Sequence, residues 1–165
     1  CDEFENAIEG DGWDTIANVL SASDDLLNAT LCANADEVEK GIENVHMDNT
    51  SILSYNDENS LSCAITIAYF SARKYYVMIR EMPTGKGFAD IVFLPKFPYD
   101  KPALIVELKW NQSVTGAISQ IKERKYIKSL QDYKGEVLLV AVNYDKTTKK
   151  HQCIIEKYQK DSTPI

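Results

Sequence analysis

The chain has 165 residues, of which 44% are hydrophobic and 26% are charged, and its net charge is −7. This length can form one sizeable core, and the composition is that of a globular domain, which excludes a disordered chain. No stretch approaches the roughly 18 apolar residues that a membrane-spanning helix needs, and the acidic start of the chain is unlike a basic secretory signal. We therefore expect a cytoplasmic protein. The lack of an initial methionine suggests a piece of a longer protein.

The cysteines and histidines exclude several kinds of site. The four cysteines are widely scattered, without a Cys-x-x-Cys spacing, and the chain has two histidines. This pattern predicts neither a zinc site nor a disulfide framework, so we expect reduced thiols. It also argues against nucleophilic catalysis by a Cys/His or Ser/His pair.

Charge is divided unevenly along the chain. Residues 1–72 have one basic and fifteen acidic side chains, a net charge of −14, whereas residues 73–130 have +6 and residues 131–165 have +1. A basic excess in the middle of an acidic chain hints at contact with a polyanion. The acidic first part is either a solvated face or a docking surface.

Helical periodicity dominates the first third of the chain. Apolar residues recur at helical spacing through residues 13–31, with a turn-like cluster at 21–24, so we expect several short helices there. Residues 47–51 have the composition of a linker. We therefore divide the chain into a helical extension, or the end of an upstream region, at 1–50 and a main domain at 51–165.

The main domain is predicted to alternate helices and strands. The expected elements are a helix at 56–73, strands at 75–80, 88–94 and 103–110, a helix at 113–127, and strands at 136–143 and 150–156. A glycine-rich turn between the first two strands predicts an antiparallel hairpin. The nearly continuous apolar run at 136–143 is typical of parallel pairing after a helical crossover. This order predicts an α/β fold, a sandwich of helices on both faces of a central mixed sheet.

Three charged residues lie in two of these otherwise apolar strands. Asp90 interrupts the run 88–94, and Glu107 and Lys109 interrupt the run 103–110. Side chains at i and i+2 leave a strand on the same face, so Glu107 and Lys109 point together. Charges inside such strands are costly unless they are paired, hydrated or bound to a metal. If the two strands pair, two carboxylates and one ammonium group converge, and the carboxylate oxygens suit Mg²⁺ or Mn²⁺.

Each of these residues also has an ordinary structural explanation. An isolated aspartate such as Asp90 is usually exposed at the edge of a strand, and a Glu-x-Lys pair is frequent on a solvated sheet face. The unbroken apolar residues 103–106 leave no solvated face for the second strand. The sequence therefore favours a metal site.

The strings around the three charges resemble a known family. The motifs that carry the resemblance are Gly87-Phe88-Ala89-Asp90, Glu107-Leu108-Lys109, and Gln120-Ile121-Lys122 followed by Tyr126. They resemble the PD-(D/E)xK nuclease superfamily, although Ala89 stands where the superfamily's nominal proline precedes the metal aspartate. Further strings at 55–61, 83–87 and 105–111 are similar to the nuclease-like domain at the C-terminus of bacterial AAA-ATPase-like proteins. The resemblance covers about residues 50–158 and implies a restriction-endonuclease-like fold.

The resemblance implies a metal-dependent nuclease acting on DNA, and in second place on RNA. Asp90, Glu107 and the Leu108 carbonyl would bind Mg²⁺ or Mn²⁺, Lys109 would position and activate the attacking water, and Gln120 would steady that water or a phosphate oxygen. For Gln120 an exposed position on a helix is the ordinary explanation.

A second interpretation belongs to a different functional class. The domain is then a non-catalytic, nuclease-like module that regulates or docks on an ATPase-like domain of the same or a neighbouring chain. Its acidic first third would serve as the docking surface. Neither interpretation involves a membrane.

Overall fold

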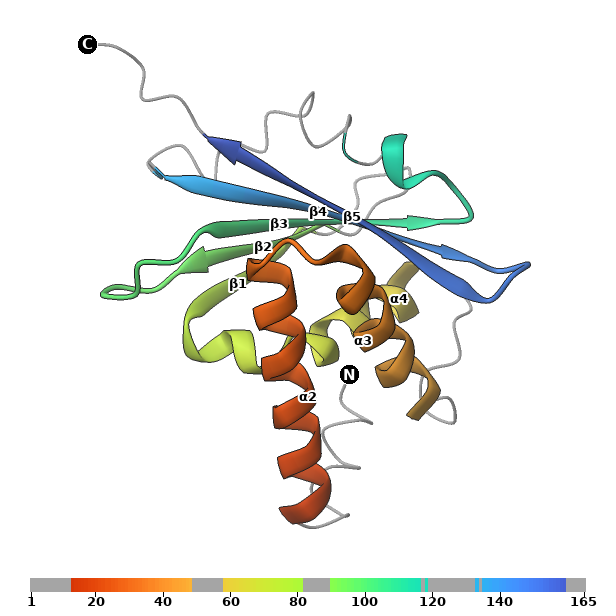
Figure 1. Cartoon of the computed structure of the whole chain (residues 1–165), viewed down its shortest axis with the longest axis horizontal. Coiled ribbons are helices and arrows are strands. Elements are labelled where there is room, and N and C mark those ends of the chain that lie inside the picture. The colour runs from red at the N-terminus through yellow and green to blue at the C-terminus, as the bar shows by residue number, and fades with distance from the viewer. Residues whose placement is uncertain are drawn as a thin grey trace.

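The computed structural model describes residues 13–48, 58–81, 90–116, 118, 133 and 135–159. Its centre is a five-stranded sheet in which the strands lie side by side in chain order (Figure 1). The strands are β1 (Tyr76–Glu81), β2 (Asp90–Pro95), β3 (Ala103–Trp110), β4 (Glu136–Asp145) and β5 (Lys150–Gln159). All five were predicted, with ends that differ by three residues or fewer.

Strand pairing in the sheet is mixed. β1–β2, β2–β3 and β4–β5 pair antiparallel, whereas β3 and β4 pair in parallel. A parallel pair needs a crossover connection, and the chain between β3 and β4 is helical at residues 114–116 and 118. The predicted hairpin, parallel pair and α/β class are confirmed.

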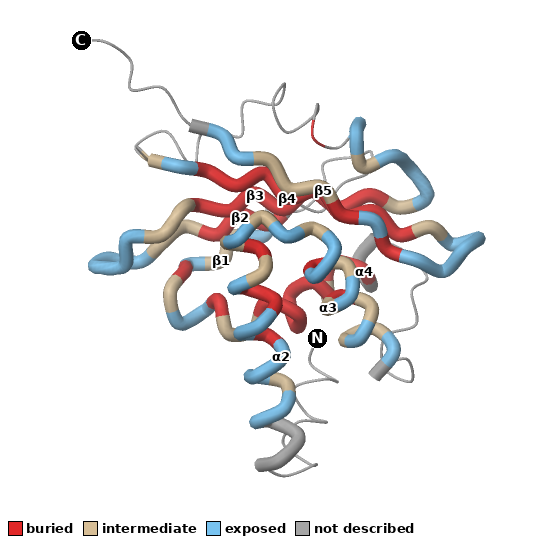
Figure 2. The backbone as a smooth tube through the Cα atoms, viewed as in Figure 1, coloured by how far each residue is buried: buried red, intermediate tan, exposed pale blue. Residues whose placement is uncertain are grey.

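Three helices and a short 3₁₀ segment cover one face of the sheet (Figure 1). They are α2 (Trp13–Leu31), α3 (Ala35–Asp48), α4 (Glu58–Ala68) and η1 (Phe70–Lys74). Their apolar side chains form one core with the sheet, including Leu27, Ile42 and Leu61 from the helices and Leu104 and Val140 from the strands. Figure 2 shows this burial along the inner sides of the helices and through the central strands. None of the described helices is long and apolar enough to cross a membrane.

The other face of the sheet has a smaller core of its own. Val92, Ile105 and Leu139 form its centre, and Ile118 from the crossover packs against them. The side chains of β3 are therefore buried on both faces from Ala103 to Lys109. This double burial places any charged side chain of β3 out of contact with bulk water.

Two sequence predictions in the first third are wrong. Helix α2 continues through residues 21–24, where a turn was expected, because Ser23 is held by a distant partner: its Oγ donates to Ser71 Oγ (3.0 Å) and accepts from the Ser71 amide (2.8 Å). Such tertiary contacts outweigh a local turn preference. Residues 47 and 48 end α3 and are not a linker, while the rest of the expected linker lies outside the described residues.

Because α2 and α3 share a core with the sheet, they pack as part of the same body as β1–β5. The division into an extension at 1–50 and a main domain at 51–165 stays a prediction.

Helix α3 also meets the outer edge of the sheet, at β5. Glu39 Oε1 accepts a hydrogen bond from the Cys153 amide (2.7 Å), and Glu43 Oε1 accepts one from the His151 amide (3.2 Å). The His151 side chain is buried, with its ring centroid 5.6 Å from that of His46. Burial, with a smaller contribution from His46, lowers the pKa of His151 to about 4.

The expectation of reduced thiols is wrong for Cys63, which is disulfide-bonded. Distance along the sequence is a poor guide to distance in a fold, so scattered cysteines do not exclude a bond. Cys32 and Cys153 are free, and burial, with Glu39 nearby, raises the pKa of the Cys153 thiol to about 12.

Candidate functional site

The predicted charged pair on β3 is buried in the second face of the sheet. Glu107 is 0% exposed and Lys109 is 1% exposed. Their side chains leave β3 on the same face, and Lys109 Nζ lies 3.5 Å from Glu107 Oε1. Two opposite charges therefore meet inside an otherwise apolar layer that also contains Ile105 and Ala141.

A buried ion pair is a weak source of stability. Removing both charges from water costs roughly what their attraction returns, and apolar residues of similar size often do as well or better. The neighbouring side chains on this face of the sheet are apolar residues of that kind. Buried, coupled charges in the centre of a domain are instead a common property of functional sites.

Asp90 is the first residue of β2, and the strand register places it directly opposite Glu107. Directly opposed residues of an antiparallel pair lie on the same face of a sheet. The positions 90, 107 and 109 therefore share one face and lie on adjacent strands. The Asp90 side chain lies outside the described part of the structure.

The other two predicted site residues are placed differently. Leu108 is buried in the core on the opposite face, beneath the helices, as strand alternation requires, so only its backbone carbonyl is a candidate ligand. Gln120 lies outside the described residues. The metal and catalytic roles of Asp90, Glu107, Leu108, Lys109 and Gln120 remain predictions.

Asn143 is a polar residue of this face that the sequence did not single out. It is 2% exposed and is the register partner of Lys109 in the parallel β3–β4 pair. Its Oδ1 accepts a hydrogen bond from the Gln112 amide (3.0 Å), which fixes the chain just after β3. The available signal was a single polar residue ending the apolar run of β4. Asn143 thus holds the end of the strand that carries the charged pair.

Asn111 reinforces this anchoring. It has φ of 51°, a left-handed conformation that asparagine tolerates better than most residues. Its amide donates to the Tyr144 carbonyl (2.9 Å), and its Oδ1 accepts from the Lys146 amide (2.7 Å). The chain leaving β3 is therefore tied to β4 by Asn111 as well as by Asn143.

The residue types at this site fit a hard divalent cation. Asp90 and Glu107, at paired positions of β2 and β3, are the two acidic residue types available here, and the described side chains include no group of three or more His, Cys, Asp or Glu residues that could hold a metal alone. Mg²⁺ and Mn²⁺ need only one or two carboxylates, because they keep several waters and bind substrate phosphates. A cation held jointly with substrate therefore suits this donor set.

Comparison with known proteins adds an independent observation. The family model described as the PD-(D/E)XK nuclease superfamily matches residues 56–156, a segment that contains Asp90, Glu107 and Lys109. It covers more than half of the chain, from just before α4 to within β5. The mixed sheet with flanking helices is consistent with the restriction-endonuclease-like fold of that superfamily. No curated relative of the chain was found.

Proposed function

Because the chain belongs to the PD-(D/E)XK nuclease superfamily, we propose that it is a metal-dependent phosphodiesterase that hydrolyses DNA, with RNA as the second choice. The observation that carries this proposal is the buried Glu107–Lys109 pair, whose charged atoms lie 3.5 Å apart on the strand in register with Asp90. An apolar layer has no structural need for this pair. A phosphoryl-transfer site needs both signs of charge in one place.

The proposed roles follow from the chemistry of each group. The carboxylates of Asp90 and Glu107 and the Leu108 carbonyl would hold Mg²⁺ or Mn²⁺. When bound, such an ion lowers the pKa of its water and offsets phosphate charge. The Lys109 ammonium would orient the attacking water and stabilise the negative charge that grows on the phosphate. Gln120 would steady that water or a phosphate oxygen.

The burial of the pair adds a requirement. With both side chains closed off from solvent, substrate phosphate reaches Lys109 only if the atoms that cover it move aside. Exclusion of water strengthens the electrostatic effect of Lys109 once a phosphate is in place.

The test is cleavage of plasmid and single-stranded DNA with Mn²⁺ or Mg²⁺, with RNA assayed in parallel. Removing Lys109 alone takes the opposite charge away from a buried carboxylate and threatens the fold, so the pair is neutralised together as Glu107→Gln with Lys109→Met. We expect this double variant to fold and to lose at least about 100-fold in cleavage rate, the scale of a lost acid–base or charge-stabilising group. Asp90→Asn should show a similar loss.

A matched control is available on the surface. Glu136 and Lys157 form an exposed cross-strand pair, 3.9 Å apart, on β4 and β5. The double variant Glu136→Gln with Lys157→Met should cleave at the wild-type rate. Equal cleavage by the Glu107/Lys109 variant, Asp90→Asn and the wild type would end the proposal.

The closure of the pair also favours a second candidate, a nuclease-like module that regulates or docks on an ATPase-like domain without cleaving anything. Calorimetric titration with Mn²⁺ separates the two. A nuclease should give saturable heat that disappears in Asp90→Asn, whereas a module without a metal site should give none.

A further inference from the structure

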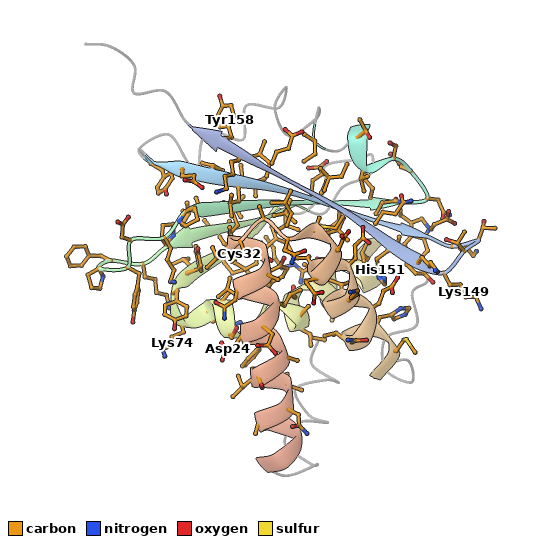
Figure 3. All side chains as sticks on the ribbon, viewed as in Figure 1. Asp24, Cys32, Lys74, Lys149, His151 and Tyr158 are labelled. Carbon is orange, nitrogen blue, oxygen red and sulfur yellow. The ribbon has the colours of Figure 1, made fainter. Side chains whose placement is uncertain are left out.

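A group of aromatic and basic side chains surrounds the loop between β2 and β3. We name the aromatic–basic patch by its six members, which are Lys74, Tyr75, Lys96, Phe97, Tyr99 and Lys101. The loop enters β3 at Ala103, whereas Glu107 and Lys109 lie toward the other end of that strand. Figure 1 shows the loop at the left end of the sheet, and Figure 3 labels Lys74 at the same end.

The patch exposes aromatic rings to an unusual degree. Phe97 is 98% exposed and Tyr99 is 41% exposed, although large apolar side chains gain by burial. Tyr99 packs edge-on against Tyr75, with ring centroids 5.0 Å apart. Clustered exposed apolar surface marks interaction sites, whereas single exposed apolar residues are ordinary.

Cations surround these rings. Lys101 Nζ lies 4.6 Å from the centre of the Tyr75 ring, and Lys74 Nζ lies 5.3 Å from it. Because both lysine ammonium groups lie against the Tyr75 ring, the rings that remain open to a ligand are those of Phe97 and Tyr99. Arg73, next to Lys74, stacks over Phe70 with its guanidinium carbon 5.1 Å from the ring centre.

The patch is held in shape by hydrogen bonds to backbone carbonyl groups. The Lys96 amide donates to the Tyr75 carbonyl (2.7 Å), and the Tyr99 amide donates to the Lys96 carbonyl (2.8 Å). Lys96 Nζ donates to the Arg73 carbonyl (2.6 Å). These bonds attach the loop to η1 and β1. Little conformational entropy of the loop is therefore lost when a ligand binds.

The local charge is positive in a chain whose net charge is −7. Arg73, Lys74, Lys96 and Lys101 provide four cations. Asp100 in the loop and Asp24, which follows the Ser23 that bonds to η1, offset two of them. Net positive charge next to exposed aromatic rings suits a ligand that carries negative charges and also has flat groups that can stack on the rings.

We propose that the aromatic–basic patch binds single-stranded nucleic acid, with bases stacked on Phe97 and Tyr99 and phosphates next to Lys74, Lys96 and Lys101. Every base has a face that can stack, so such a surface is tolerant of sequence and selects for unpaired strands. The inference rests on the proposed nuclease function and adds a substrate form to it. The six steps of β3 from Ala103 to Lys109 span about 20 Å, so one strand of sufficient length reaches both places.

The test is fluorescence anisotropy of a labelled oligo(dT) of about twenty nucleotides, roughly 70 Å if stacked, with EDTA present so that no cleavage occurs. We expect Phe97→Ala to weaken binding about five-fold or more and Phe97→Trp to restore it, because stacking is lost and then regained. Lys74→Gln and Lys101→Gln should each reduce the slope of log K against log salt by about 0.7. Phe97 is almost fully exposed, so its removal leaves the fold intact.

Two control variants remove similar groups elsewhere. Tyr158, an aromatic residue 48% exposed on β5, is the control for Phe97, and Lys149, in the β4–β5 turn at the far end of the molecule, is the control for Lys74 (Figure 3). Lys149 has φ of 57°, so it is replaced by asparagine, which tolerates that conformation. Tyr158→Ala and Lys149→Asn should bind oligo(dT) like the wild type. Equal losses in the control and patch variants would overturn the proposal.

Further outcomes separate this inference from the nuclease proposal. If Phe97→Ala binds oligo(dT) as tightly as the wild type while the protein still cleaves DNA, the patch proposal fails and the nuclease proposal stands. If the patch binds oligo(dT) but no metal-dependent cleavage occurs, the nuclease proposal fails alone. Binding to vesicles rich in anionic lipid, lost in Phe97→Ala and with no binding to oligo(dT), would assign the patch to membranes and overturn the inference.

Discussion

His151 is a buried base whose surroundings favour its neutral form. Its Nδ1 lies 3.9 Å from Glu43 Oε1, and its ring packs against those of His46 and Tyr144. Burial, with a smaller effect of His46, lowers the pKa of His151 from 6.5 to about 4. A histidine that must stay neutral in the folded state makes the fold sensitive to acid.

We expect the free energy of unfolding to fall as the pH drops from about 6.5 toward 4. In that range the unfolded chain binds a proton at position 151 and the folded chain does not, so acid favours unfolding, by up to about 3 kcal/mol for this shift. Above pH 6.5 residue 151 is neutral in both the folded and the unfolded chain, so none of this stability is lost. Urea denaturation at a series of pH values measures it. The His151→Gln variant should lose much less stability over this range, and an unchanged pH dependence would contradict the assignment.

Helix α3 is attached to β5 by side chains that act as backbone acceptors. Glu39 and Glu43 are four residues apart and so lie on one face of the helix, where they meet the amides of Cys153 and His151. A buried amide that loses its acceptor costs about 1–3 kcal/mol. The helix therefore contributes hydrogen bonds to the sheet as well as apolar contacts.

We predict that Glu39→Ala lowers the free energy of unfolding by about 1–3 kcal/mol, because the Cys153 amide is left without this acceptor. Glu37, on the same helix, is the matched control. Its side chain is exposed and forms a surface ion pair with Lys40. Such a pair contributes little, so Glu37→Ala should change the free energy of unfolding by less than about 1 kcal/mol. Equal effects of the two substitutions in urea denaturation would show that the edge contact is not stabilising.

The strands were predictable because their patterns are local. The apolar runs at 103–110 and 136–143 and the glycine-rich turn before Asp90 each carry their own signal, and together they imply the mixed sheet. The course of α2 through residues 21–24 was not predictable, since it depends on Ser71, 48 positions away. Short polar residues favour turns until a distant partner satisfies them.

The candidate site was predictable in part. The i, i+2 spacing alone places Glu107 and Lys109 on one face, and their burial follows from the apolar run around them. Asn143 was missed because its role depends on register, which puts it opposite Lys109 and within reach of the Gln112 amide. Register between distant strands has no local signature in one sequence.

The acidic helices α2 and α3 and the candidate site lie on opposite faces of the sheet. α2 and α3, from the segment with net charge −14, cover one face of the sheet, whereas the Glu107–Lys109 pair lies in the other face. The net charge of −7 therefore does not describe the potential near the candidate site. A charged partner responds to the distribution of charge over the surface that it approaches and not to the net charge of the chain.

Removing residues 1–50 should prevent stable folding of the rest. Leu26, Leu27, Val38 and Ile42 are buried in the same core as β1–β5, so the fragment 51–165 would expose the apolar surface beneath them. We expect this fragment to aggregate or to unfold without cooperativity in urea. Gel filtration and urea denaturation measure both properties. A monomeric fragment with a sharp transition would instead support a separable extension.

The contact of Glu39 and Glu43 with β5 also protects part of an outer edge of the sheet. An open outermost strand is a template on which another chain can add its own strand, and repeated addition leads to fibrils. Here two carboxylates already occupy the outward amides of residues 151 and 153. A second molecule therefore cannot add a strand to the sheet at those positions of β5.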